Sequence, residues 1–197
     1  MVEFKYSGDE LYARMERAVE KVIERMRNTV GILEGAGIPY AIVGGHAVRA
    51  WVAQVDEAAV RNTRDVDVLI RPEDLPAVKD AMLAAGFHYR QTSGLDMFVE
   101  DPDASARDAV HVVLAGQMVR PDDFEANPDI DPSEQTDQFR TLTLERLVRM
   151  KLSSFRDKDR VHVRDMIDLG MVDESWLAKY PDELAGRLKQ LLDDPDG

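Results

Sequence analysis

Hydrophobic residues near the N-terminus follow the longest regular pattern in the chain. Between residues 9 and 33 they recur at steps of three and four, the spacing of one face of an α-helix. The members of this face are Leu11, Met15, Ala18, Val19, Val22, Ile23, Met26, Val30 and Leu33. Gly35 and Gly37 then end the pattern, because glycine favours helix termination. The sequence therefore predicts one long amphipathic helix, which we assign to an N-terminal unit of residues 1–37.

A short apolar run after Pro39 begins a second region, in which predicted strands and helices alternate. The run Tyr40–Val43 is typical of a buried strand, and it ends at Gly44 and Gly45. Helices are then expected over residues 46–54 and 75–85, and strands over residues 63–70, 97–100 and 110–114. A β-α-β-α-β-β order is typical of a mixed sheet with helices packed on it, so the expected class is α/β or α+β. We assign residues 38–120 to this core.

Residues 121–137 interrupt the hydrophobic pattern. This segment contains seven acidic residues, three prolines and no basic residue, so it predicts a linker or surface loop outside any core. Helical patterns return over residues 144–155, 161–169 and 182–192. We therefore expect a small C-terminal helical subdomain of residues 138–197.

Composition narrows the functional classes. The 197 residues include 25 Lys and Arg against 38 Asp and Glu, a net charge of −13, which disfavours general binding to nucleic acid or to anionic lipid. The longest stretch without charge is too short to span a bilayer, and the N-terminus lacks the basic and apolar segments of a signal peptide. No cysteine is present, which excludes disulfides and thiolate chemistry. We expect a cytoplasmic protein without a membrane partner.

Asp65 and Asp67 are the first candidates for chemistry. Residues two apart in a strand project from the same face, so these carboxylates stand side by side while Val66, Val68 and Ile70 face apolar packing. Adjacent carboxylates repel unless a cation lies between them, and Mg²⁺ typically binds one or two carboxylates plus substrate phosphates. The alternative is a pair of solvated aspartates on an exposed strand face.

The glycine pair at the end of the predicted strand is the second candidate. Gly44 and Gly45 would let the backbone approach a ligand, and the following helix N-terminus would present N–H groups to an anion. Many strand-to-helix turns need glycine for backbone reasons alone. Together with the aspartate pair, the glycines predict a phosphate site beside a metal site.

Lys151 is the third candidate. It lies on the apolar face of the predicted helix over residues 144–155, four residues after Leu147 and four before Phe155. Either its stem runs along the edge of that face with the ammonium in water, or the ammonium points across a cleft at substrate phosphates. Residues 140–164 carry eight basic and three acidic residues, which favours a local anion site. Asp165 could hold Lys151 in place or accept a proton from a substrate.

These motifs together resemble a known family. The glycine pair followed by RNTRDVDV resembles the nucleotidyltransferase (polymerase β-like) fold, and RMKLSSFRDKDRVHVRDMIDL resembles an element of AbiEii-type nucleotidyltransferases, a group that includes toxins of toxin–antitoxin systems. The resemblance covers roughly residues 38–169 and implies a nucleotidyltransferase-like mixed β-sheet flanked by helices. The hydrophobic pattern adds a long N-terminal helix and a small C-terminal helical annex. The resemblance also implies Mg²⁺-dependent transfer of a nucleoside monophosphate from a nucleoside triphosphate, with pyrophosphate leaving.

The resemblance assigns roles to single residues. Gly44 and Gly45 match the phosphate-binding turn, and Asp65 and Asp67 match the metal-binding pair. Lys151 matches the lysine of the C-terminal element, where it would contact the nucleotide.

Three further positions complete the expected site. Asp165 matches the aspartate of the C-terminal element, where it would act in catalysis. We also expect His46 and Thr63, which adjoin the two motifs, to contact the nucleotide. His46 departs from the family pattern, in which a small hydroxyl residue is common, and the 19-residue spacer before Asp65 requires an insertion around residues 55–60.

His111 is the most consequential departure. The family pattern has a third carboxylate in the middle of the next core strand, and this chain has His111 there. A neutral His111 could act as the catalytic base but is a poor Mg²⁺ ligand, and Asp108 or Glu100 could supply the missing carboxylate. The four histidines show no spacing typical of a histidine metal site.

Three hypotheses remain open at this stage. The first is a nucleotidyltransferase whose acceptor is RNA, a protein side chain or a small molecule, with a cognate antitoxin as a further partner. The second is a catalytically impaired protein of the same fold that binds nucleotide or a partner. The third is a structural protein that forms a homodimer through its N-terminal helix.

Overall fold

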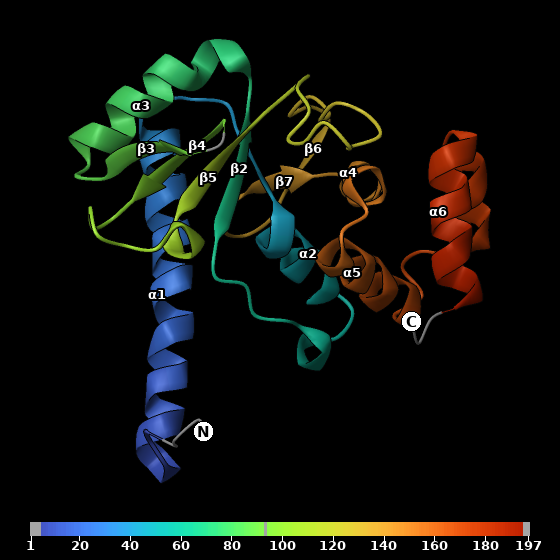
Figure 1. Cartoon of the computed structure of the whole chain (residues 1–197), viewed down its shortest axis with the longest axis horizontal. Coiled ribbons are helices and arrows are strands. Elements are labelled where there is room, and N and C mark those ends of the chain that lie inside the picture. Colours follow the sequence, from blue (N-terminus) through green and yellow to red (C-terminus); the bar gives the residue numbers. More distant parts are fainter. Residues whose placement is uncertain (1–4, 93, 195–197) are drawn as a thin grey trace.

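A seven-stranded mixed sheet forms the centre of the computed structural model, which describes residues 5–92 and 94–194 (Figure 1). The strands are β1 (Ala41–Val43), β2 (Val66–Ile70), β3 (His88–Thr92), β4 (Leu95–Val99), β5 (Val110–Leu114), β6 (Ser133–Gln135) and β7 (Arg140–Leu142). Their order in the sheet is β3-β4-β5-β2-β1-β7-β6, with β2/β5 and β1/β7 parallel and the other neighbours antiparallel. The mixed α/β class expected from the sequence is confirmed.

The described residues form six α-helices, which pack on the two faces of this sheet or on one another. They are α1 (Gly8–Gly35), α2 (Gly44–Val52), α3 (Leu75–Ala84), α4 (Leu144–Ser154), α5 (Asp157–Asp168) and α6 (Asp182–Asp193). Short 3-10 helices lie at Glu57–Ala59, Pro72–Asp74, Ala106–Asp108 and Glu174–Lys179. Helices α1 and α3 pack on one face, and α2, α4, α5 and α6 contribute to the core on the other (Figure 1).

The alternation in β2 determines which face carries the polar residues. Val66, Val68 and Ile70 are fully buried in the core formed with α1 and α3, as their spacing predicted. Leu69 packs into the opposite core, and Asp67 shares its side of the strand. The aspartate therefore lies on the face covered by the C-terminal helices.

Three strands were missing from the sequence prediction. Strand β3 (HYRQT) and strand β6 (SEQ) are polar, largely exposed edge strands, so neither shows an apolar alternation. Strand β7 has only three residues. Strand β2 begins at Val66, later than the predicted Thr63, because residues 63–65 approach it without strand pairing.

The acidic segment 121–137 contributes more to the structure than its composition predicted. Ile130 is 2% exposed and belongs to the core shared by the sheet and the C-terminal helices, so the expectation that the segment stays outside any core is wrong there. Glu125 accepts a bidentate hydrogen bond from Arg149, and its backbone N–H donates to Ser153 Oγ at 2.9 Å. The division of the chain into units at this segment stays a prediction.

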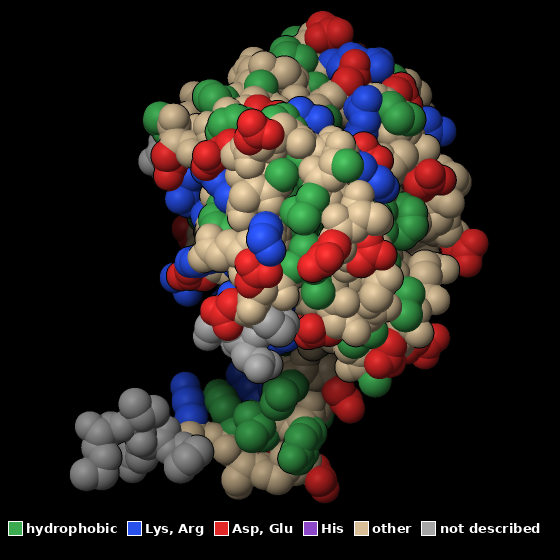
Figure 2. Space-filling view, turned by 90° about the vertical axis from the view of Figure 1, so that its right-hand side faces the viewer, with side chains coloured by type: hydrophobic (Ala, Val, Ile, Leu, Met, Phe, Trp, Pro, Cys, Tyr) green, Lys and Arg blue, Asp and Glu red, His purple; other side chains and the backbone are tan. Residues whose placement is uncertain are grey.

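The first half of α1 extends away from the sheet, as Figures 1 and 2 both show. Leu11, Tyr12 and Met15 on this part are 39%, 65% and 55% exposed. A homodimer through this helix stays a prediction.

Across the described residues, no helix combines the length and the apolar character that crossing a membrane requires. Residues 1–4, on which the signal-peptide expectation partly rests, lie outside the described residues.

Candidate functional site

A cavity of about 480 Å³ lies between the sheet and the C-terminal helices. Asp65, Asp67 and His111 line it from β2, β5 and the segment just before β2. Basic side chains line it from α4, α5 and the connection between them: Lys151, Arg156 and Lys158. The cavity therefore combines metal-ligating side chains with cations that suit phosphate groups.

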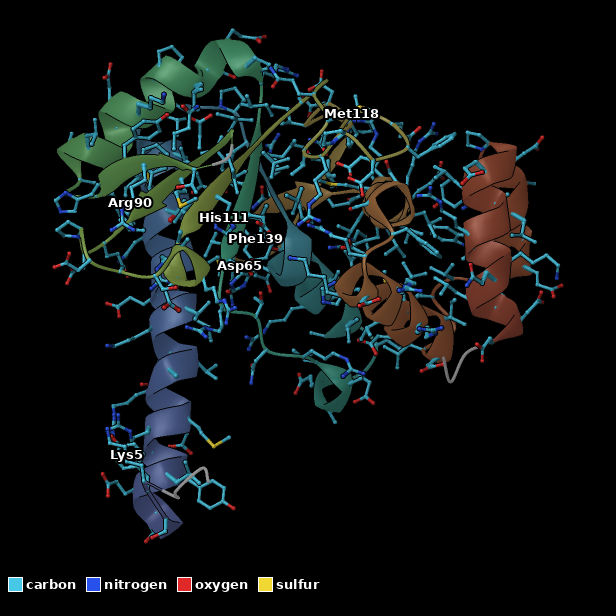
Figure 3. The ribbon with its side chains drawn as sticks, in the orientation of Figure 1. Lys5, Asp65, Arg90, His111, Met118 and Phe139 are labelled. Carbon is cyan, nitrogen blue, oxygen red and sulfur yellow. The ribbon has the colours of Figure 1, made fainter. Side chains whose placement is uncertain are left out.

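Strand register brings Asp67 and His111 together. The two residues are direct partners in the parallel pair β2/β5, as expected for a position on the next core strand. Nδ1 of His111 lies 3.3 Å from Oδ1 of Asp67 and 3.8 Å from Oδ2 of Asp65. One ligand atom from each of the three side chains lies within 4.8 Å of the other two, and Figure 3 shows Asp65 and His111 close together. Their side chains are 15–24% exposed.

The charges of this group stabilise one another. The hydrogen bond that the Asp67 carboxylate accepts from His111 raises the pKa of His111 above its ordinary value, although burial acts in the opposite direction. Burial raises the pKa of Asp67, but the hydrogen bond and charge of His111 outweigh burial and hold that pKa below its usual range. Asp67 is therefore a firmly ionised carboxylate, as a metal ligand requires.

Gly44 and Gly45 allow this group to lie against the start of α2. Gly44 adopts φ +66°, and a Cβ atom there would lie 1.9 Å from Oδ2 of Asp67. A Cβ atom on Gly45 would lie 2.7 Å from Oγ1 of Thr63. Gly44 lines the main cavity with Asp67, whereas Gly45 lines a smaller pocket behind it.

Thr63 orients the Asp65 carboxylate through a hydrogen bond. Its hydroxyl Oγ1 donates to Oδ1 of Asp65 at 2.7 Å, which leaves Oδ2 of Asp65 directed toward His111. Its expected contact with nucleotide stays a prediction, because Thr63 is not among the described residues that line the main cavity.

Lys151 is buried and ion-paired. It is 5% exposed, and its Nζ donates to Oδ1 of Asp159 at 2.9 Å. Asp159 also accepts from Arg156 Nε at 2.6 Å and from Ser154 Oγ at 3.2 Å. Burial raises the pKa of Asp159, but Lys151 and Arg156 outweigh it and lower that pKa to about 2. The residue that holds Lys151 is therefore Asp159, and the expectation that Asp165 does so is wrong.

Asp165 has a different partner. Its carboxylate accepts two hydrogen bonds from Arg61, at 2.6 Å and 2.9 Å. Within the described ranges, Asp165 lines the small pocket with Gly45 and is absent from the main cavity. Its expected catalytic role stays a prediction without geometric support.

Among the described residues, His46 is not part of the lining of the main cavity. It is 3% exposed and lines a separate cavity between α1 and α2, where burial lowers its pKa to about 4. Within the described part of the chain, its Nε2 has no hydrogen-bond partner. The expected contact of His46 with nucleotide therefore finds no support in the main cavity.

The two proposed substitutes for a third carboxylate are both engaged elsewhere. Asp108 pairs with Arg64 at 2.9 Å, and Glu100 pairs with Arg25 at 3.0 Å. Neither belongs to the metal-ligating group among the described residues, so this expectation is wrong. His111 itself occupies the third position, although histidine spacing alone did not indicate a metal site.

Sequence reasoning missed part of the cavity wall. Arg156, Lys158 and Asp159 line the cavity from the α4–α5 region. The basic charge of residues 140–164 indicated the two cations only as part of a local anion site. Asp123 and Asn127 line it from the segment interpreted as a linker. That segment forms a wall because α4 holds Glu125.

A family match assigns this fold to the nucleotidyltransferases. Residues 12–153 match a family described as uncharacterised nucleotidyltransferase, and the chain belongs to that family. The match covers most of the chain, including the glycine pair, the aspartate pair and Lys151. No curated protein matches the sequence.

Several solved structures resemble this chain at low sequence identity. An antigenic nucleotidyltransferase-like protein from Paracoccidioides brasiliensis has a TM-score of 0.56 at 16% identity, over 91% of each chain. The antibiotic-resistance factor ANT(2'')-Ia has a TM-score of 0.48 at 11% identity, over 91% of each chain. JHP933 from Helicobacter pylori has a TM-score of 0.46 at 19% identity, over 96% of this chain and 78% of its own. The first of these supports the nucleotidyltransferase-like fold.

Proposed function

We propose that this protein transfers a nucleoside monophosphate from a nucleoside triphosphate to an acceptor hydroxyl, with a divalent cation such as Mg²⁺. One observation carries the proposal: Asp65, Asp67 and His111 share a single cavity with Lys151. Carboxylates beside cations suit a metal-bound triphosphate, because the ion binds carboxylate and phosphate oxygens together.

The proposal assigns a separate role to each group of side chains. Asp65 and Asp67 would hold the cation, which neutralises charge on the triphosphate and polarises the α-phosphoryl group. Lys151 and its basic neighbours Arg156 and Lys158 would bind the β- and γ-phosphates. Gly44 leaves room for the Asp67 carboxylate at the start of α2.

The proposed reaction is an in-line displacement at the α-phosphorus. The acceptor oxygen forms a bond with this phosphorus while the bond to the bridging oxygen of pyrophosphate breaks, and pyrophosphate leaves with that electron pair. The proton of the acceptor hydroxyl passes to the Asp65 carboxylate, the most exposed of the three cavity groups. Acceptors within this proposal are RNA, a protein side chain or a small molecule.

Transfer of label tests the proposal. The purified protein is incubated with each α-³²P-labelled nucleoside triphosphate, Mg²⁺ or Mn²⁺, and separate RNA, protein and small-molecule fractions of a cell extract. We expect label in one fraction, and a loss of at least about a hundredfold for Asp67→Asn because the cation loses a ligand. The matched control is Asp108→Asn, which alters an acidic residue paired with Arg64 outside the metal-ligating group. Absence of label with every triphosphate would contradict the proposal.

The AbiEii-type resemblance adds a finer proposal, that the protein is the toxin of a toxin–antitoxin system. Its support is the position of Lys151, which lines the cavity as that resemblance implies. Expression of the wild type is then expected to arrest growth, and expression of Asp67→Asn is not. Equal growth of both strains would contradict the toxin role without affecting the proposed transfer.

The histidine in the third position supports a second candidate function, a module that binds nucleotide without turnover. His111 is hydrogen-bonded to Asp67, where the family pattern has a carboxylate. Thermal-shift titrations with ATP, GTP, CTP and UTP distinguish the two functions. Binding that is independent of divalent cations, together with absence of label transfer, favours the module.

A further inference from the structure

The orientation of the His111 ring is fixed by a backbone carbonyl. Nε2 lies 2.9 Å from the carbonyl oxygen of Ala106, and because a carbonyl can only accept, Nε2 carries the hydrogen. The hydrogen bond between Nδ1 and Asp67 needs a second proton, on Nδ1, and a cation that binds there would displace this proton. In the resulting neutral ring, Nδ1 is unprotonated and faces Asp67 and Asp65. Strands on both sides keep the residue in place, because His111 pairs with Asp67 of β2 and Met97 of β4.

This arrangement is the one that metal-ligating histidines adopt. Their second ring nitrogen typically donates to a backbone carbonyl or carboxylate, which selects the tautomer and aims the free nitrogen at the ion. Thr63 orients Asp65 in a comparable way, because its hydroxyl donates a hydrogen bond to Oδ1 and leaves Oδ2 facing His111. His111 and Asp65 are therefore each oriented by a neighbour that is not a ligand.

We infer that His111 is a direct metal ligand, and that the site prefers a first-row transition-metal ion such as Mn²⁺ to Mg²⁺. Mg²⁺ is a hard ion that favours oxygen, whereas imidazole nitrogen favours transition-metal ions. A donor set of two carboxylates and one imidazole therefore binds a transition-metal ion in preference to Mg²⁺. The inference rests on the proposed function for the role of the ion, but metal binding itself can be measured without any transfer reaction.

The nitrogen ligand can be detected directly. Pulsed electron paramagnetic resonance of Mn²⁺ bound to the wild-type protein is expected to show ¹⁴N coupling from one imidazole. The coupling is expected to disappear in His111→Asp and to persist in His88→Asp, which changes an exposed histidine on the edge strand β3 of the same sheet. Absence of the coupling in the wild type would overturn the inference and would identify His111 as an imidazolium paired with the two aspartates.

Competition between ions tests the preference. Calorimetric titrations of the folded proteins with Mn²⁺ and with Mg²⁺ give the ratio of the two dissociation constants. Replacing the imidazole by a third carboxylate in His111→Asp is expected to shift this ratio toward Mg²⁺ by about ten- to hundredfold. An unchanged ratio would overturn the preference. Thermal unfolding without metal checks that each variant is folded.

The outcomes separate this inference from the proposed function. Bound Mn²⁺ with ¹⁴N coupling but no label transfer supports the inference and contradicts the transferase. Label transfer with a preference for Mg²⁺ and no ¹⁴N coupling supports the transferase and overturns the inference.

Discussion

A Cβ atom on Gly44 would lie 1.9 Å from Oδ2 of Asp67, so the carboxylate occupies the space that any other residue would need. The same glycine has φ +66°, a conformation that disfavours other residues. Two separate physical reasons therefore call for glycine at this position, and only the first concerns the candidate site.

Substitution of Gly44 by alanine separates these reasons. We expect Gly44→Ala to displace Asp67 and to weaken metal binding by about tenfold or more, in addition to a backbone cost of roughly 1–3 kcal/mol. Gly37→Ala is the matched control, because Gly37 also has φ +66° but nothing within 4 Å of its added Cβ. Metal titration and urea unfolding of both variants provide the measurement. Equal metal affinity in the two variants would show that displacing Asp67 does not weaken metal binding.

Strand alternation predicted the side of β2 on which Asp67 lies, whereas Asp65 lies just before the strand. Asp67 lies opposite the apolar side of β2, and His111 is its direct partner in the parallel pair β2/β5. Alternation with a period of two needs no knowledge of how distant elements pack. The order of the predicted elements does not determine that β5 lies next to β2 in the sheet, so the position of His111 beside Asp67 was expected from the family pattern alone.

The partner of Lys151 could not be predicted in this way. Helical periodicity identified the face on which Lys151 lies, but its counterion depends on how α4 and α5 meet. Asp159 lies in the first turn of α5, where an acidic residue is expected from the helix dipole alone, yet it is completely buried between Lys151 and Arg156. Asp165 shares an apolar row, but its partner Arg61 comes from a distant part of the chain.

The buried His46 and the half-buried His162 predict a loss of stability in mild acid. Burial lowers the pKa of His46 and of His162 to about 4, against 6.5 for an exposed histidine. The unfolded chain therefore binds more protons than the folded one between pH 6.5 and 4, and the free energy of unfolding falls as the pH decreases through this window. The expected loss between pH 7 and 5 is about 2 kcal/mol for each histidine.

Urea unfolding at pH 7 and pH 5 measures this effect. His111 acts in the opposite direction because its pKa is raised, so the comparison is made between wild type and variants. His46→Gln and His162→Gln are each expected to reduce the pH dependence, whereas the exposed His88→Gln leaves it unchanged. An identical pH dependence in all four proteins would contradict the assignment to His46 and His162.

The Arg61–Asp165 pair predicts a structural role for Asp165. The Arg61 side chain is 61% exposed, and pairs of this kind contribute up to about 1 kcal/mol. Arg61→Ala and Asp165→Asn are therefore expected to lower the free energy of unfolding by similar small amounts, and the double variant by less than their sum. Loss of label transfer in Asp165→Asn at unchanged stability would instead support the catalytic role implied by the AbiEii-type resemblance.

The Lys151–Asp159 pair predicts a larger effect on folding. Because both side chains are buried, Lys151→Met leaves Asp159 with Arg156 as its only cationic partner among the described residues, and we expect a loss of about 3 kcal/mol. Lys189→Met is the matched control, because Lys189 pairs with Asp193 at 2.8 Å while both side chains are more than half exposed. Its expected cost is about 0.5 kcal/mol, measured by urea unfolding of both variants at pH 7.

Nucleotide binding separates a functional lysine from one that only stabilises the fold. Lys151 lines the cavity that contains Asp67, so its ammonium is available to a bound triphosphate as well as to Asp159. Losing a charge-assisted contact with phosphate costs roughly 1.5–3 kcal/mol, so Lys151→Met is expected to weaken binding of a metal–triphosphate complex by about ten- to hundredfold. Calorimetric titration at a temperature where the variant remains folded measures this loss, and Lys189→Met is expected to bind as the wild type does. A Lys151→Met protein that unfolds more easily but binds the triphosphate equally well would show that the lysine serves the fold alone, because the cavity would then recognise phosphate without it.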